Sequence, residues 1–176
     1  MRSIRLLLAG VVLLQLSGAA IAAEPQQIFI VRHAEKSAAP APPASGAAMT
    51  APGDDPPLST TGRARAERLA VMLRSAGIRH VFSTEFLRTR QTAAPTAQAL
   101  HLDPVAIPAK DADGLLSQLA QAQGNALVVG HSNSVAALLQ RLGIKEDISI
   151  AESEYDNLFI VTRGAAGGST LARLRY

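Results

Sequence analysis

The 176-residue chain has no cysteine, no tryptophan and few aromatic residues of any kind, 3% in all. Because it has no cysteine it forms no disulfide, so a hydrophobic core must supply its stability. The scarcity of aromatic residues and the lack of a basic stripe argue against a nucleic-acid-binding surface. No pair of histidines or carboxylates has the spacing of a metal site such as H-E-x-x-H, so we expect no metal. The length suits a single domain.

Long apolar runs are also missing, except at the N-terminus. Two arginines there precede an apolar run from Leu6 to Leu16, and an Ala-Ile-Ala triplet follows. This order is typical of a secretory signal peptide. The alternative is an anchor that stays attached, but the run is shorter than the ~20 residues of a membrane span. We expect residues 1–22 to be cleaved, leaving one exported domain over 23–176, in a bacterial periplasm and with no stable membrane span.

Apolar runs alternate with helical patterns along the rest of the chain. The alternation predicts parallel βαβ units, and the unbroken apolar strands fit a sheet buried on both sides. Two late runs around a Gly-rich turn predict a hairpin at one edge. We therefore expect an α/β fold, a three-layer sandwich whose mostly parallel central sheet has helices on both faces. The expected strands are Ile28–Val31, Ile78–Phe82, Val105–Ile107, Ala126–Val129, Leu158–Thr162 and Thr170–Leu174, and the expected helices cover 61–75, 85–100, 113–123 and 134–142.

One segment does not fit this alternation. Residues 37–57 are rich in Pro, Ala and Gly and show neither a helical nor a strand period, which predicts a flexible loop. The loop directly follows the charged residues that end the first strand. Two hypotheses remain open for it: a tolerated surface insertion, or a flap over a site.

Polar residues follow three of the expected strands at their carboxyl ends. Arg32 and His33 follow the first, Arg88 lies in the first turns of the helix after the second, and His131 follows the strand that ends at 129. In an open parallel sheet, ligands gather outside these carboxyl ends. Two histidines and two arginines are therefore expected at one edge. Arginine forks match phosphate oxygens, and a neutral imidazole is a competent nucleophile toward phosphorus, so the set predicts a phosphoryl site.

The helix that carries Arg88 adds to this prediction. Either Ser83 or Thr84 is expected to cap it, and its N-terminus favours an anion. Each residue also has a purely structural explanation: Arg88 can pair with Glu85 three residues earlier, and His131 can be a satisfied turn histidine. His80 and His101 are expected to be structural, because neither lies at the carboxyl edge. The shared placement of the other residues is what favours a site.

Four segments resemble the motifs of the histidine phosphatase superfamily, which has the phosphoglycerate mutase-like fold. They are "VRHAEK", "LSTTGRARA", "STEFLRTRQTA" and "VVGHSNSV", in the family's order and over nearly all of the chain after the leader. The chain is similar to small exported bacterial members. The resemblance implies that His33 becomes phosphorylated, that Arg32, Arg88 and His131 bind the phosphoryl oxygens, and that the partner is a small phosphorylated substrate, with no metal or cofactor needed.

The chain departs from the family pattern at two points. Ala34 stands where the commonest pattern has Gly after the Arg-His pair. Larger members supply a general acid, often Glu, from the loop beyond the second arginine helix, where this chain offers Asp111 or Asp113 and no Glu. We take Asp111 as the candidate acid and Glu35 as the other candidate. A leaving group that departs without an acid is the third possibility.

The expected activity is a histidine acid phosphatase-like phosphoric monoester hydrolase. His33 attacks phosphorus while Arg32, Arg88 and protonated His131 stabilise the charge, and water then hydrolyses the phosphohistidine. One alternative is a non-catalytic phosphate-binding protein. Another is a serine hydrolase using Ser132, because "GHSNS" nearly matches the G-x-S-x-G elbow; that fold places its histidine after the serine, however, and no histidine follows His131.

Overall fold

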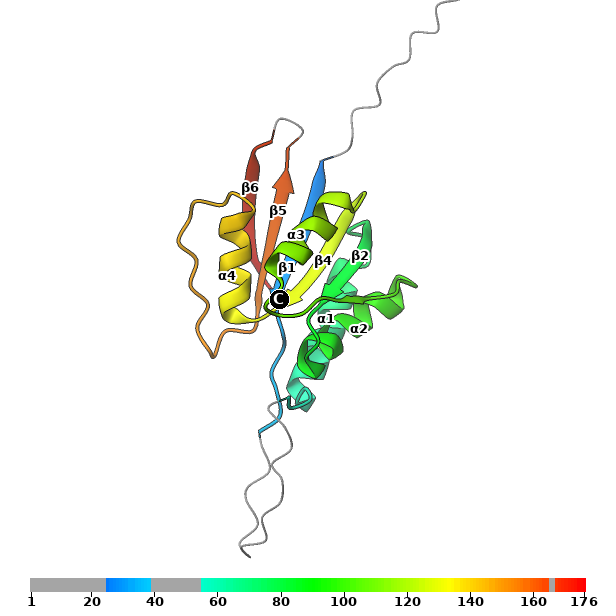
Figure 1. The fold of residues 1–176 in the computed structure, drawn as a ribbon. Coiled ribbons are helices and arrows are strands. Elements are labelled where there is room, and N and C mark those ends of the chain that lie inside the picture. The colour runs from blue at the N-terminus through cyan, green and yellow to red at the C-terminus, as the bar shows by residue number, and fades with distance from the viewer. Residues whose placement is uncertain (1–24, 39–54, 165–166) are drawn as a thin grey trace, which may run out of the picture.

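The computed structural model describes residues 25–38, 55–164 and 167–176 (Figure 1). The predicted signal peptide over 1–22 lies outside these ranges, as do residues 39–54 of the predicted loop over 37–57. The elements are, in order, β1 (Gln26–Arg32), α1 (Thr60–Leu73), β2 (Ile78–Ser83), α2 (Leu87–Ala99), β3 (Val105–Ala106), α3 (Ala112–Gln121), β4 (Asn125–Gly130), α4 (Ser132–Arg141), β5 (Asn157–Arg163) and β6 (Ser169–Arg175).

The strands form one six-stranded sheet in the order β3-β2-β4-β1-β5-β6. β1 pairs in parallel with β4, and β2 pairs in parallel with both β4 and β3. β5 runs antiparallel to β1 and to β6, so the predicted C-terminal hairpin is confirmed at one edge. The α/β prediction of a mostly parallel central sheet is also confirmed.

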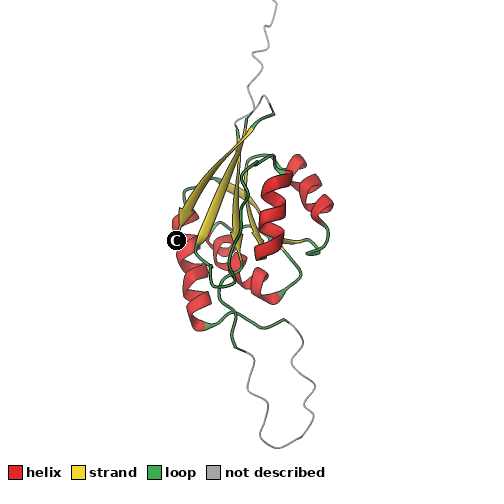
Figure 2. Ribbon diagram, turned by 90° about the vertical axis from the view of Figure 1, so that its left-hand side faces the viewer, coloured by secondary structure: helices red, strands yellow, loops and turns green. Residues whose placement is uncertain are grey.

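Helices cover both faces of the sheet, as Figure 2 shows. β1 explains why: its buried side chains alternate, with Ile28 and Ile30 on one face and Phe29 and Val31 on the other. The first face packs against α3 and α4, and the second against α1 and α2. A strand that is apolar on both faces must be sandwiched in this way.

The start of α2 differs from the prediction. The helix begins at Leu87, and its N-cap residue Phe86 makes no side-chain cap, so the expected cap by Ser83 or Thr84 is wrong. The carboxylate of Asp55 accepts the N–H of Leu87 instead, at 2.9 and 2.8 Å to its two oxygens. Asp55, which is distant in sequence, thus accepts a backbone N–H at the start of the helix that Ser83 or Thr84 was expected to accept.

The parallel strands bring their carboxyl ends to one edge. Arg32 at the end of β1 lies beside Gly130 at the end of β4, and the N–H of His33 donates to the carbonyl of Gly130 at 2.9 Å. The residues after β1, β2 and β4 therefore share this edge. None of the helices within the described ranges has the length and apolar character needed to cross a membrane.

Candidate active site

A cavity of about 370 Å³ opens at the carboxyl edge of the sheet. Four residues singled out from the sequence line it together: Arg32, His33, Arg88 and His131. Its wall also carries three charged side chains that the sequence did not single out as site residues, Lys36, Lys110 and Glu152. Asp111 and Glu35 are not among the residues that line it. The cavity is thus rich in cations, as an anion site requires.

His33 lies at the base of the site and is 5% exposed. Its Nδ1 lies 2.8 Å from the carbonyl oxygen of Ala34, which can only accept a hydrogen bond, so Nδ1 carries the proton and Nε2 keeps its lone pair. Burial lowers the pKa of His33 to about 4, and the nearby positive charges of Arg32 and Arg88 act in the same direction. The imidazole is therefore neutral near pH 7, with its lone pair on Nε2.

His131 faces His33 across the site, with the two ring centroids 5.4 Å apart. Its Nε2 lies 3.1 Å from the hydroxyl of Thr84, which is itself 2.8 Å from the hydroxyl of Thr89. Burial, and then the positive charge of Arg88, hold the pKa of His131 below its ordinary value. The lowered pKa favours the neutral form of His131 near pH 7, whereas the sequence-based mechanism has it protonated. A bound phosphate dianion would favour the protonated form.

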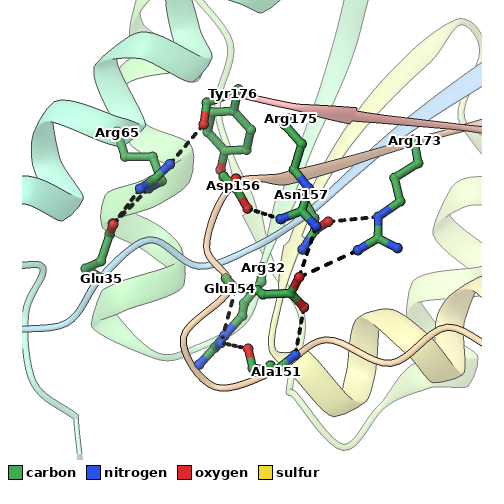
Figure 3. Close-up of polar contacts among 10 residues, drawn as sticks. All are labelled: Arg32, Glu35, Arg65, Ala151, Glu154, Asp156, Asn157, Arg173, Arg175 and Tyr176. Carbon is green, nitrogen blue, oxygen red and sulfur yellow. Dashed lines mark hydrogen bonds and ion pairs between the residues drawn. The ribbon is translucent and has the colours of Figure 1, made fainter.

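Arg32 is held by the segment that precedes β5 (Figure 3). Its Nη1 donates to the carbonyl oxygens of Ala151, Glu152 and Glu154 at 2.9, 3.0 and 3.3 Å. Its Nη2 donates to the carboxylate of Glu152 at 2.9 Å, and the ring of Tyr155 lies 4.3 Å from the guanidinium carbon. The buried Nε–H has no partner among the described residues. The guanidinium is fixed in place while one donor stays unused.

Arg88 extends from the first turn of α2 into the cavity. Its Nη1 lies 3.3 Å from the carboxylate of Asp55, and its guanidinium carbon lies 4.3 Å from the ring centre of Phe86. Glu85, the alternative partner considered for Arg88, accepts the N–H of Ala109 at 2.7 Å. Asp55 does not line the cavity, so it approaches Arg88 from outside the space that a ligand would fill.

The three carboxylates considered as a general acid have other roles in the structure. Asp111 caps α3, accepting the N–H of Gly114 at 2.8 Å. Asp113 pairs with Arg141. Glu35 pairs with Arg65 at 2.7 Å; burial raises the pKa of Glu35, but the hydrogen bonds and charge of Arg65 outweigh it, so the pKa is lowered overall. An ionised carboxylate cannot donate a proton.

Glu152 is the residue of the cavity that sequence reasoning missed most clearly. One carboxylate oxygen accepts from Arg32, and the other accepts the hydroxyl of Ser132 at 3.0 Å. The residues from 143 to 156 form no helix or strand, so no periodic pattern marked Glu152 as part of a site. Ser132 is bonded to a carboxylate here rather than to a histidine, which does not match the arrangement of a serine hydrolase. Within the described ranges no three His, Cys, Asp or Glu side chains are grouped to hold a metal ion.

Comparisons with known proteins agree with this geometry. The model of the histidine phosphatase superfamily (branch 1) matches residues 28–111, a range that ends before His131. A Proteus mirabilis (strain HI4320) protein named "probable phosphoglycerate mutase GpmB" is 29% identical over 163 residues, which cover 83% of this chain and 73% of that protein.

Solved structures share the fold. The protein histidine phosphatase SixA complexed with tungstate aligns with a TM-score of 0.63 at 24% identity, covering 85% of this chain and 96% of that one. A mycobacterial glucosyl-3-phosphoglycerate phosphatase aligns with a TM-score of 0.62 at 13% identity, covering 85% and 98%. The chain is thus similar in sequence to members of the histidine phosphatase superfamily, and it shares its fold with these solved structures.

Proposed function

We propose that the protein is a metal-independent phosphatase that hydrolyses a small phosphomonoester through a phosphohistidine on His33. One observation carries the proposal: a buried, neutral imidazole, with its proton held on Nδ1 by the Ala34 carbonyl, lines a cavity together with Arg32, Arg88 and a second imidazole. A non-catalytic phosphate-binding protein needs the arginines but has no use for a nucleophile arranged in this way.

The reaction has two steps. In the first, the Nε2 lone pair of His33 forms a bond to phosphorus while the bond from phosphorus to the leaving oxygen breaks, and that oxygen takes a proton from solvent. In the second, the oxygen of a water molecule bonds to phosphorus as the phosphorus–nitrogen bond breaks, which releases inorganic phosphate and a proton. In both steps Arg32, Arg88 and His131 stabilise the charge on the equatorial oxygens.

The arginines are suited to this task because their positions are set before a ligand arrives. Backbone carbonyls hold Nη1 of Arg32, and its Nε–H has no partner within the described ranges. Arg88 lines the cavity, and Asp55, which does not line it, lies 3.3 Å from Arg88. Donors fixed in advance lower the cost of reorganisation when charge develops.

A specific observation supports a second candidate substrate class. Glu152 is the only carboxylate among the described residues that line the cavity, and the hydroxyl of Ser132 and the charge of Arg32 lower its pKa. An ionised carboxylate does not protonate a leaving alcohol. The site is therefore also suited to phosphorus–nitrogen bonds, whose amine leaves readily once protonated. The name of the fold relative SixA, a protein histidine phosphatase, describes such a substrate.

The proposal includes export, with a phosphorylated substrate met outside the cytoplasm. It rests on the order of charged, apolar and small residues over 1–22. Fractionation of cells expressing the full chain would test this part, since the processed protein is expected in the periplasmic fraction. Full-length protein in the cytoplasm would contradict it.

A screen of residues 23–176 against phosphomonoesters and a phosphoramidate, with EDTA present, tests the activity. We expect hydrolysis of at least one substrate at an EDTA-independent rate. Binding of inorganic phosphate without turnover of any substrate would favour the non-catalytic alternative. The ratio of kcat/KM values for phosphoramidate and alkyl phosphate would decide between the two substrate classes.

A further inference from the structure

Glu35 and Arg65 form a close ion pair (Figure 3), and neither is among the residues that line the cavity. Nε of Arg65 lies 3.0 Å from each carboxylate oxygen of Glu35, and Nη2 lies 2.7 Å from Oε1. The two side chains are only 17% and 20% exposed. The remaining nitrogen, Nη1, donates to the backbone oxygen of Tyr176 at 2.9 Å. The guanidinium of Arg65 is thus bonded both to Glu35 and to Tyr176, which fixes its position better than a single contact would.

The pair lies next to the hydrogen bond that sets the tautomer of His33. The acceptor of that bond is the carbonyl of Ala34, and this carbonyl belongs to the peptide group that joins Ala34 to Glu35. The direction of the carbonyl therefore depends on where Glu35 is held. On its other side, the N–H of Ala34 donates to the hydroxyl of Thr92 at 3.0 Å.

Residues at the start of helix α1 contact the backbone of Glu35 as well as its side chain. The N–H of Ser59, which caps α1, donates to the carbonyl of Glu35 at 2.9 Å. Gly62 lies so close that a Cβ added there would be 2.2 Å from the same carbonyl oxygen. Arg65 follows one helical turn later and reaches the carboxylate. One helix end thus holds both the main chain and the side chain of Glu35.

We propose that Glu35 and Arg65 are a positioning pair for the nucleophile: they hold the Ala34 carbonyl against Nδ1 of His33 and so keep the lone pair on Nε2. Neither side chain lines the cavity, so the pair acts through the backbone and not on the substrate. The catalytic consequence rests on the proposed function, whereas the effect on the tautomer does not.

The test combines a spectroscopic and a kinetic measurement on residues 23–176. The imidazole nitrogen shifts of the four histidines, assigned by single substitutions, report which nitrogen of each carries the proton. In the wild type we expect His33 to be protonated on Nδ1 alone. In Glu35→Gln and Arg65→Gln we expect a mixture of tautomers, with kcat reduced about tenfold or more and KM within about twofold.

Two further variants sharpen the test. Arg65→Lys keeps the charge but loses the fork, so its kcat should lie between those of the wild type and Arg65→Gln. The double variant should be no worse than the more affected single variant, because the two residues act as one unit. Arg74→Gln is the matched control: it removes an exposed arginine from the C-terminal end of the same helix and should leave both the tautomer and kcat unchanged.

The outcomes separate the two proposals. If Glu35→Gln and Arg65→Gln melt at lower temperature but keep the wild-type tautomer and kcat, the pair is merely structural and the inference is overturned. If Arg65→Gln does not fold, Glu35→Gln and Arg65→Lys decide the question alone. If the wild type hydrolyses nothing but the tautomer changes as expected, the proposed function fails and the positioning role stands.

Discussion

The imidazole rings of His33 and His131 lie 5.4 Å apart and meet edge-on, with an angle of 66° between their planes. One follows β1 and the other follows β4, and the parallel pairing of these strands sets their separation. Each ring has one nitrogen engaged, by a backbone carbonyl in His33 and by the Thr84 hydroxyl in His131. The two rings are therefore oriented by the fold itself before any substrate binds.

His33 is expected to carry the phosphoryl group. Rapid quenching of the wild type under alkaline conditions with labelled substrate should trap an acid-labile phosphohistidine, and His33→Ala should abolish it. Ser132→Ala is the control, because Ser132 bonds to Glu152 and has no part in the transfer, so this variant should still be labelled. An acid-stable label on Ser132 would support the serine alternative instead.

Arg88→Ala should lower kcat/KM by ~10²-fold or more, the scale expected when one preorganised donor to a charged transition state is lost. The steady-state kinetics of Arg90→Ala provide the comparison, since Arg90 is exposed on the same helix. Near-normal kinetics of Arg88→Ala would show that Arg88 has only a structural role, to which its contacts with Asp55 and Phe86 contribute.

Asp55→Ala should weaken both α2 and the anion site. The variant leaves the N–H of Leu87 without its cap, which costs about 1 kcal/mol, and removes the ion pair between Asp55 and Arg88. We expect a lower melting temperature together with weaker binding of inorganic phosphate by calorimetry. Asp113→Ala, which removes an exposed carboxylate from the first turn of α3, should leave phosphate binding unchanged. Equal effects of the two variants on binding would contradict a local role for Asp55.

The free energy of unfolding should fall as the pH drops from 6.5 to 4. Burial lowers the pKa of His33 from 6.5 to about 4 in the folded state, so over this range the unfolded chain binds a proton that the folded chain does not. The contribution of His33 to the free energy of unfolding is fully present above pH 6.5 and is lost by pH 4. It amounts to roughly 3 kcal/mol at most. Denaturant titrations should show that the free energy of unfolding of His33→Asn depends less steeply on pH than that of the wild type. The same pH dependence in both proteins would show that His33 is not its cause.

Gly62→Ala should destabilise the protein and impair the site together. The added Cβ would lie 2.2 Å from the backbone oxygen of Glu35. Because this clash is with the backbone, the movement of a flexible side chain cannot relieve it. We expect a melting temperature lower by several degrees and a loss of activity beyond that explained by unfolding. Gly168→Ala is the matched comparison, because a Cβ there meets no atom within 4 Å. Comparable melting and activity in the two variants would show that the backbone of Glu35 moves freely.

The sequence was sufficient to predict the features of the fold and of the site that depend on patterns among neighbouring residues. Strands that are apolar on both faces, such as Ile28–Val31, and polar residues at their ends follow from local periodicity and sheet geometry. Contacts between distant segments could not be predicted in this way. Asp55 caps α2 from across the fold, and Glu152 reaches Arg32 from an irregular segment. Asp111 was chosen as an acid for its place in the chain, yet it lines no part of the cavity that holds the histidines.

The sheet order has a consequence for how the protein folds. β1, which His33 directly follows, is the first of the described strands but a central strand of the sheet. Both of its neighbours, β4 and β5, come from the second half of the sequence. The pairing of β1 with these strands requires contacts between residues far apart in the sequence, and such contacts form slowly. A nascent chain that ends before β4 has no partner strand for β1, so the residues around His33 acquire their final arrangement only when synthesis is nearly complete.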